Sequence, residues 1–519
     1  MNLAKSYSVS LIGLSGTLVE VEAEISSNLP AFVLVGLPDT SLLEAKDRVR
    51  AALANSGTAM PSRRVTVNLS PASVRKRGAG FDLAIAMAIL AADKKIDPNS
   101  VASCIHLGEL ALDGSIRPIS GVLPAVLSAK QAGYGKVIVP MQNLSEASLV
   151  QSIEVLGASS LGQVAAHHGL GGGSVALPSI GELPVHSTSV AASKPDLADV
   201  VGQDEAIEAI TIAAAGGHHM LMVGPAGVGK TMLAERLAGL LPDLSDEQAL
   251  ECAAIASVLG KYDNGVKLSY RPPFEAPHHS ASMSALIGGG MGVPQPGLVS
   301  LAHRGVLFLD EVPEFQRPAL DSLRQPLESG EVTVNRSSGT ARFPARFQLV
   351  MAANPCPCGN WGSKARSCRC QASVRHSYSA KLSGPLLDRI DIRLRLQAPT
   401  QVQSTLARLG ATEIGRDTES VRALVEKARR RAAARLASSG FRLNSEIPGT
   451  LLRRRYRPSH AATLRLDRAL DRGLISMRGY DRCLRLAWTC ADLAGKETPD
   501  EHDLAKAFLL RGEDGNSAW

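Results

Sequence analysis

One eight-residue stretch restricts the possible folds of this chain more than any other feature. The pattern G-x4-G-K-[ST] is matched at every position by Gly224, Pro225, Ala226, Gly227, Val228, Gly229, Lys230 and Thr231. An apolar run, 219–223, precedes the pattern, and residues 232–241 follow it with a helical period. A chance glycine-rich turn is the alternative. However, a strand before the loop and a helix after it are typical of a phosphate-binding loop in a parallel α/β sheet.

The chemistry of this loop predicts ATP and Mg²⁺ as ligands. Its glycines allow backbone N–H groups to surround phosphates, and the positive end of the helix dipole adds to the attraction. Lys230 can reach the terminal phosphates, and the Thr231 hydroxyl can ligate Mg²⁺.

Two further apolar runs end in polar residues that suit hydrolysis. Residues 306–309 precede Asp310 and Glu311, and residues 347–353 precede Asn354. Ligands of open α/β sheets bind at the carboxyl edge of the strands. We therefore expect Asp310 to hold Mg²⁺, Glu311 to polarise the attacking water and Asn354 to position it. The alternatives are a strand that merely ends in an acid and an asparagine that begins a turn.

Length and composition indicate more than one domain. A chain of 519 residues exceeds one ordinary domain, and 45% hydrophobic with 20% charged residues fits a packed globular protein. We expect a mixed α/β domain in 1–165, a flexible linker in 166–194, an ATPase core in 195–400 and a basic helical lid in 401–519. No uncharged apolar run reaches about 18 residues, and the first residues do not read as an export signal. We therefore expect a cytoplasmic protein without a membrane segment.

Positive charge is concentrated near the C-terminus. The net charge is +7, and residues 421–485 alone contain 17 Lys/Arg and 5 Asp/Glu. Such a region suits a polyanion such as nucleic acid. A solvated helical face explains the same charge equally well, so charge alone leaves both interpretations open.

Four of the eight cysteines are clustered, namely Cys356, Cys358, Cys368 and Cys370. Four thiols on a short loop can form a tetrahedral structural Zn²⁺ site, although the C-x-C arms are shorter than the usual C-x2-C arms. The basic neighbours Lys364, Arg366 and Arg369 would help stabilise thiolates. The alternative is a mobile loop with four reduced, unliganded cysteines.

Several phrases of the sequence resemble those of a known family. They are FEAPHHSASMSALIGGG (274–290), LAHRGVLFLDE (301–311), VMAANPCPCG (350–359), SGPLLDRIDI (383–392) and SMRGYDR (476–482). Residues 196–519 resemble the magnesium-chelatase-like branch of AAA+ ATPases, and the whole chain resembles the ComM/YifB family of bacterial competence proteins. The resemblance implies a hexameric ring. It also implies that Arg389 is an arginine finger for the neighbouring subunit's γ-phosphate and that Arg478 is a second sensor of nucleotide state, acting through the helical lid. An interface ion pair is the alternative for each arginine.

Two insertions mark this branch of the AAA+ ATPases. Residues 278–297 resemble the insert in the second helix, and residues 331–346 resemble the hairpin before the first sensor. In related ring helicases such hairpins line the central pore and grip DNA. The resemblance therefore makes Arg336 and Arg342 candidate phosphate contacts. The alternative is that they form ion pairs with nearby acids, Glu328 or Glu331.

The N-terminal segment resembles the Lon-protease-like fold without its peptidase chemistry. The phrase KRGAGFDLAIAMAIL (76–90) matches the nucleophile region, but Gly80 stands where the serine would be, and Leu123 stands near the place of the partner lysine. Without a hydroxyl and its base no acyl-enzyme can form. We expect a scaffold or DNA-guiding domain, with some basic surface from Arg63, Arg64, Lys76 and Arg77.

Three functions compete on this sequence. The resemblance implies a helicase on single-stranded and branched DNA that promotes branch migration in natural transformation and homologous recombination. Its partners would be further copies of itself and recombination proteins. A magnesium-chelatase-like motor subunit that remodels a partner protein would share the same ATPase core. An ATP-dependent protease or unfoldase is the third candidate, and the missing serine and lysine argue only against its peptidase activity.

Overall fold

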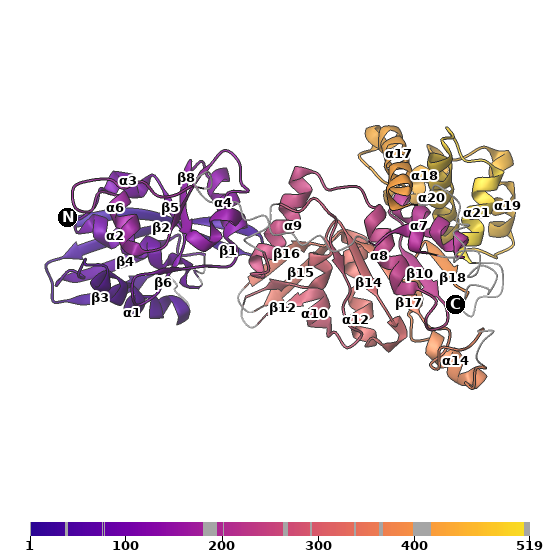
Figure 1. The fold of residues 1–519 in the computed structure, drawn as a ribbon, viewed down its shortest axis with the longest axis horizontal. Coiled ribbons are helices and arrows are strands. Elements are labelled where there is room, and N and C mark those ends of the chain that lie inside the picture. The colour runs from indigo at the N-terminus through magenta and orange to yellow at the C-terminus, as the bar shows by residue number, and fades with distance from the viewer. Residues whose placement is uncertain are drawn as a thin grey trace.

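A computed structural model describes residues 2–36, 40–74, 76, 78–179, 195–200, 202–262, 268–290, 293–336, 339–362, 367–397 and 417–512. The described residues form two lobes that lie end to end, with the N-terminal strands in one lobe and the C-terminal helices at the far end of the other (Figure 1). Outside the described residues lie part of the predicted linker, the boundary between core and lid, Arg77, Lys364 and Arg366. The predicted domain boundaries therefore stay predictions.

The N-terminal lobe is built on a mixed seven-stranded sheet in the order β3-β4-β2-β1-β5-β8-β9. Its strands are β1 (Asn2–Ile12), β2 (Ser15–Ser26), β3 (Ala31–Val35), β4 (Arg64–Ser70), β5 (Ile105–His106), β8 (Lys136–Pro140) and β9 (Glu154–Ala158), with a separate ribbon of β6 (Glu109–Leu110) and β7 (Ile116–Arg117). Its helices are α1 (Thr40–Asn55), α2 (Asp82–Ala92), α3 (Pro98–Ala102), α4 (Val122–Gln131), α5 (Leu144–Ala147) and α6 (Leu161–His167). Every residue of α2 is buried, which explains why this helix is apolar on all sides.

The second lobe contains a five-stranded parallel sheet in the order β11-β14-β17-β10-β18. Its strands are β10 (Met220–Val223), β11 (Phe274–Glu275), β14 (Val306–Leu309), β17 (Gln348–Ala353) and β18 (Ile392–Arg395). The longer flanking helices are α7 (Asp204–Gly216), α8 (Lys230–Leu240) and α9 (Asp246–Val258). The three central strands are continuous buried apolar runs, because helices cover both faces of a parallel sheet.

Shorter elements surround the edges of this sheet. They are α10 (Met283–Ile287), β12 (Gly288–Gly289), β13 (Gln295–Pro296), α11 (Leu298–Leu301), η5 (Val312–Glu314), α12 (Arg317–Ser322), α13 (Arg324–Ser329), β15 (Glu331–Arg336), β16 (Gly339–Pro344), α14 (Ala372–Ser379) and α15 (Gly384–Leu387). Strands β15 and β16 form an antiparallel hairpin, as hairpin-tip chemistry in the sequence suggests.

The C-terminal region is helical and shares a core with the ATPase sheet. Its helices are α17 (Thr418–Leu436), α18 (Gly449–Arg454), α19 (His460–Asp471), α20 (Met477–Ala494) and α21 (Glu501–Arg511). One continuous cluster of buried side chains joins α7, β10 and β18 to these helices. The predicted fold class, an α/β core with a parallel sheet and a helical C-terminal region, is confirmed. Within the described residues, no helix is both long and apolar enough to cross a bilayer.

The two lobes meet at a packed joint. Helix α4 packs against α9, and the backbone N–H groups of Gly121 and Leu123 donate to Ser257, at 2.9 Å to its carbonyl oxygen and 3.3 Å to its hydroxyl. The turn between β1 and β2 also reaches the β15–β16 hairpin, where Gly13 lies against Ala341 and Phe343. Leu123, which the resemblance places near the position of the lysine of a Lon-type dyad, is a fully buried residue of the joint.

Candidate functional site

The phosphate-binding loop lies at the carboxyl edge of the parallel sheet. It leaves β10 at Val223, and α8 begins at Lys230, so the helix N-terminus faces the loop. Gly227 and Gly229 have φ angles of 81° and 87°, the left-handed region that glycine adopts without strain. The loop therefore needs glycine at both positions to turn its N–H groups inward.

Lys230 connects this loop to the neighbouring strand. Its Nζ donates to the carbonyl oxygens of Gly224 at 2.7 Å and Pro225 at 3.0 Å, and to Oδ1 of Asn354 at 3.0 Å. Burial lowers the pKa of Lys230, although the nearby carboxylate of Asp310 opposes that shift. The structure thus brings Lys230, the predicted phosphate ligand, into direct contact with Asn354, which is predicted to position the attacking water.

The two predicted acids follow β14 at the same edge. The Thr231 hydroxyl donates to Oδ2 of Asp310 at 2.9 Å, so the two predicted Mg²⁺ ligands are adjacent. Glu311 has a φ of 50°, a left-handed conformation that is uncommon outside glycine and concentrates at functional sites. Five predicted side chains therefore lie together beside the loop: Lys230, Thr231, Asp310, Glu311 and Asn354.

His279 is a residue of this site that the sequence reasoning missed. Its Nδ1 lies 3.4 Å from Oε2 of Glu311, and both side chains are partly exposed. The histidine follows β11, the strand beside β14, and neighbouring parallel strands end at the same edge. That strand pairing is the only signal that could have connected His279 to Glu311, since 31 intervening residues separate them in the sequence.

Arg389 and Arg478 lie together at the opposite edge of the sheet. Strands β18 and β10 run in parallel register, and Arg389 precedes β18 whereas the phosphate-binding loop follows β10. At about 3.3 Å per residue, these four-residue strands span roughly 13 Å, and Arg389 lies three residues before β18. Within one chain Arg389 forms an ion pair with Glu328, and Nη1 of Arg478 lies 3.1 Å from Oδ2 of Asp388. Neither arginine is brought to the phosphate-binding loop of its own chain.

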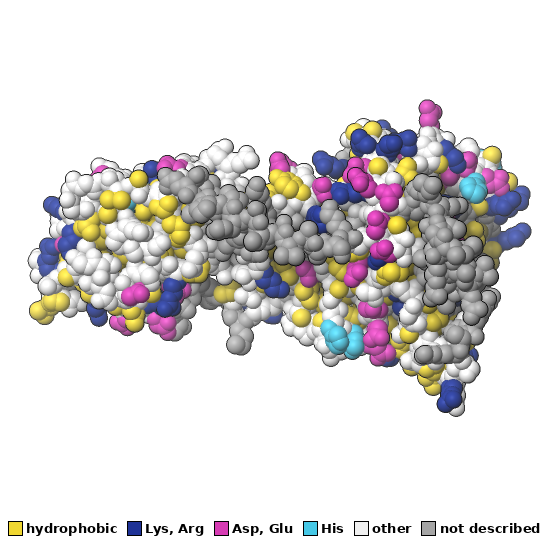
Figure 2. Space-filling view, in the orientation of Figure 1, with side chains coloured by type: hydrophobic (Ala, Val, Ile, Leu, Met, Phe, Trp, Pro, Cys, Tyr) yellow, Lys and Arg dark blue, Asp and Glu magenta, His cyan; other side chains and the backbone are white. Residues whose placement is uncertain are grey.

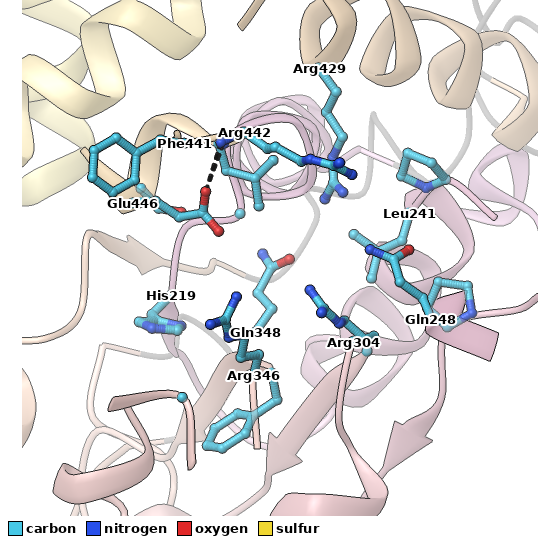
Figure 3. Close-up of a pocket in the computed structure, with 18 of the residues that line it drawn as sticks. His219, Leu241, Gln248, Arg304, Arg346, Gln348, Arg429, Phe441, Arg442 and Glu446 are labelled. Atoms are coloured by element: carbon cyan, nitrogen blue, oxygen red, sulfur yellow. Dashed lines mark hydrogen bonds between the residues drawn. The ribbon is translucent and has the colours of Figure 1, made fainter. Parts of the chain in front are cut away.

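The edge of the parallel sheet at which its strands begin is called the strand-start edge. A cavity of about 1040 Å³ opens between this edge and the C-terminal helices. The guanidinium groups of Arg304, Arg346, Arg429 and Arg442 point into it from four different segments (Figure 3). Arg389 also lines this cavity, which is distinct from the phosphate-binding loop. No pattern in the sequence indicates this cavity, because its arginines are scattered from residue 304 to residue 485.

The β15–β16 hairpin exposes both arginines that the resemblance assigned to DNA. Arg336 pairs with Gly339 near the tip, and Arg342 lies opposite Thr333. Among the described residues, neither guanidinium lies within ion-pair distance of a carboxylate, and Glu328 pairs with Arg389 instead. The expected alternative, ion pairs with neighbouring acids, is therefore not what the structure shows.

Many arginines of the basic region stabilise the helical domain itself. Lys and Arg side chains gather over the α17 end of the second lobe (Figure 2). Ion pairs to carboxylates nevertheless involve Arg422, Arg435, Arg453, Arg457, Arg465, Arg478 and Arg482. Neither a freely solvated face nor an open polyanion surface describes the whole region.

In the N-terminal lobe, the expectation that Lys76 adds to a basic surface is wrong, because its side chain is buried and Nζ donates to the carbonyl of Pro71.

The four clustered cysteines converge beyond the end of β17. Their Sγ atoms all lie within 4.8 Å of one another, and none forms a disulfide. A backbone N–H of Asn360 lowers the pKa of the Cys358 thiol to about 6, whereas burial raises the pKa of Cys356 to about 11. The spacing in the sequence predicted this convergence.

Comparison with known proteins places the whole chain in one family. Three family models match it: magnesium chelatase, subunit ChlI, over 196–404; subunit ChlI of Mg-chelatase over 21–143; and magnesium chelatase, subunit ChlI C-terminal, over 415–511. The competence protein ComM of Haemophilus influenzae is 42% identical over 98% of this chain and 98% of its own length. An uncharacterized protein of Mycobacterium tuberculosis is 50% identical over 98% and 99%, and the uncharacterized YifB of Escherichia coli 38% over 99% and 98%. A magnesium-chelatase 38 kDa subunit of Acidiphilium rubrum, 30% identical, shares only 30% of this chain. With a phosphate-binding loop, two acids and an asparagine at one sheet edge, the chain belongs to the ComM/YifB family of magnesium-chelatase-like AAA+ ATPases.

Proposed function

We propose that this chain is the subunit of a hexameric ring that uses ATP hydrolysis to move DNA and promote branch migration. One observation carries the ring: the phosphate-binding loop and Arg389 lie at opposite edges of the same sheet. An arginine that must reach a γ-phosphate can then come only from a second copy. Such head-to-tail contacts close into a ring when the rotation between subunits permits it.

In this proposal each residue at the carboxyl edge has one task. Lys230 and the loop N–H groups bind the phosphates, and Thr231 with Asp310 holds Mg²⁺. Mg²⁺ bound there would neutralise charge on the β- and γ-phosphates. Glu311 takes a proton from the attacking water, and Asn354 positions that water.

Two arginines complete the site from the neighbouring copy. The Arg389 guanidinium neutralises charge that spreads over the transferring phosphoryl oxygens. Arg478, which binds the carboxylate beside it at Asp388, is carried on the same edge. It would therefore sense the neighbour's nucleotide together with Arg389.

The β15–β16 hairpin supports DNA as the substrate. Its inner face packs through buried Val332 and Phe343, while Arg336 and Arg342 remain exposed without a carboxylate partner among the described residues. A rigid hairpin with two available guanidinium groups suits contacts to a phosphate backbone. Arg336 also lies next to Gly289 of β12, so both insertions of this branch meet at the candidate DNA contact.

The test measures assembly, turnover and DNA affinity together. We expect ATP to shift the purified chain to a ring-sized species, and single-stranded and four-way-junction DNA to stimulate turnover less as salt rises. Replacing Arg336 and Arg342 by alanine should lower the salt slope of DNA binding by about 2, because each phosphate contact contributes about 1. Arg465→Ala, an exposed arginine on α19, is the matched control.

Two outcomes would move the proposal. A chain that stays monomeric with ATP and junction DNA, and shows no nucleotide-dependent DNA affinity, contradicts it. Stimulation by a partner protein in place of DNA would favour the second candidate, a chelatase-type motor that remodels a partner. The family models that match this chain support that candidate.

A further inference from the structure

The four cysteine sulfurs have the spacing of a metal site. The Sγ atom of Cys356 lies 3.4 Å from that of Cys358 and 3.6 Å from that of Cys368, and the latter two are 3.7 Å apart. A tetrahedral Zn²⁺ with Zn–S bonds of about 2.3 Å requires sulfurs about 3.8 Å apart. A disulfide would require about 2.05 Å. The cluster is therefore arranged around a point between the sulfurs.

Two backbone N–H groups point at sulfur atoms of the cluster and help to fix their positions. The N–H of Trp361 donates to Sγ of Cys356 at 3.4 Å, and the N–H of Cys370 donates to Sγ of Cys368 at 3.4 Å. Four thiolates with no open ligand position suit a structural metal, and Zn²⁺ is the commonest metal in such a set.

The turn between the first two cysteines and the following residues touches the nucleotide site. Gly359 has a φ of 73°, and its N–H donates to the carbonyl of Cys356 at 2.9 Å. A Cβ atom at position 359 would lie 3.6 Å from Cβ of Ala226 in the phosphate-binding loop and 4.0 Å from Cγ of Asn354. Gly359 thus faces the phosphate-binding loop and Asn354 across a gap that one methyl group would fill.

The C-terminal end of the cysteine loop leads through α14 to the segment that follows Glu311. Nη1 of Arg375 on α14 donates to the carbonyl of Cys370 at 3.3 Å, and its guanidinium lies 5.2 Å from the Trp361 ring centroid. Lys381, just beyond α14, lies 3.8 Å from the carboxylate of Glu314, which closes the short helix η5 after Glu311. The cysteine loop therefore connects the phosphate-binding loop, through Gly359, with the segment that follows Glu311.

We propose that Cys356, Cys358, Cys368 and Cys370 hold one Zn²⁺, and that this metal fixes Gly359 against the phosphate-binding loop so that its loss weakens ATP binding. The proposal deepens the ATP site described above and rests on it. Without the metal, the turn loses its anchor, and the loop and Asn354 lose a packed neighbour. The nucleotide site then binds ATP less tightly without losing any residue that contacts the phosphates.

The metal is tested first, on the full-length chain purified without added metal. Elemental analysis should find about one zinc per chain, and Cys358→Ser or Cys370→Ser should remove most of it. Cys252→Ser is the control. That thiol donates to the carbonyl of His303 at 3.2 Å, and a serine hydroxyl can donate in the same way. A wild-type chain with four reactive thiols and no zinc, or with iron in its place, overturns the assignment.

The coupling is tested by the affinity of a fluorescent ATP analogue. Removing zinc with a chelator under reducing conditions should weaken binding roughly tenfold, about 1.4 kcal/mol. Gly359→Ala should keep the zinc and still weaken binding several-fold, because alanine is strained at a φ of 73° and the turn that faces Ala226 must shift to relieve that strain. Gly362→Ala is the matched control: its φ is 80°, but an added Cβ there has nothing within 4 Å.

The outcomes separate the two proposals. Equal ATP affinity with and without zinc, or equal effects of Gly359→Ala and Gly362→Ala, overturns the coupling. A zinc-loaded wild-type chain that binds no ATP contradicts the proposed ATPase function instead, while the measured zinc content still decides the metal site.

Discussion

The two edges of the ATPase sheet differ in the kinds of residue that lie there. Where the strands end, the fold assembles a glycine-rich loop, two carboxylates and an amide around one space. Where the strands begin, it assembles arginines, several of them around a cavity. The length of β10 and β18, roughly 13 Å at about 3.3 Å per residue, separates the phosphate-binding loop from the arginines. In the proposed mechanism, a single subunit therefore contains every catalytic group but cannot place them all on one nucleotide.

The largest expected effect tests this separation directly. Arg389→Ala should bind ATP normally and lose about 10³-fold in turnover, because a finger of this kind contributes at least that much. Lys230→Ala should also be inactive. When the two variants are mixed, turnover should partly return, because an intact loop from one subunit meets an intact Arg389 from its neighbour.

Steady-state turnover of the mixture shows whether Arg389 acts on the nucleotide of a neighbouring subunit. No recovery across all mixing ratios, with assembly confirmed by light scattering, would mean that Arg389 does not act in trans. Arg465→Ala, mixed with Lys230→Ala in the same way, controls for the loss of an exposed arginine.

The next effect separates binding from chemistry at the strand-end edge. Glu311→Gln keeps the size of the side chain but removes the proton acceptor, so we expect turnover to fall by about 10²-fold while ATP still binds. Equilibrium binding and single-turnover hydrolysis on the same preparation distinguish the two. If turnover stays within twofold of wild type, the base lies elsewhere.

The residues at one edge of the sheet could be predicted from the sequence better than those at the other, and the order of the elements along the chain explains the difference. The strand-end edge was predictable because its parts directly follow apolar runs, in one contiguous motif or within two residues of a strand. At the strand-start edge, Arg389 was assigned only by family resemblance. Arg304 and Arg429 carried no signal, because helix packing alone brings them together. The sequence pattern likewise could not show that Lys76 is buried, because its burial depends on the conformation of the loop that contains it.

His279 marks the limit of that reasoning at the better-predicted edge. A half-exposed pair of this kind is worth up to about 1 kcal/mol, so His279→Ala should lower kcat about fivefold and leave KM for ATP unchanged. His279→Asn should restore part of the loss by donating to the Glu311 carboxylate. His278→Ala is the control, because that ring contacts the Ser280 hydroxyl at 2.8 Å. A fivefold loss in both alanine variants would point to a general change of the segment.

The smallest effect concerns stability at the strand-start edge. Nδ1 of His219 accepts the N–H of Leu349 at 3.0 Å, and burial lowers the pKa of His219 to about 4. The unfolded chain, in which a histidine has a pKa of about 6.5, then binds protons more readily than the folded chain. Stability is therefore present above about pH 6.5 and is lost as the pH falls toward 4. From pH 7 to 6 the unfolding free energy should drop by roughly 0.7 kcal/mol more in wild type than in His219→Gln, measured by urea denaturation. Equal drops in the two proteins would show that His219 takes up a proton in the folded state, through the cavity that this residue lines.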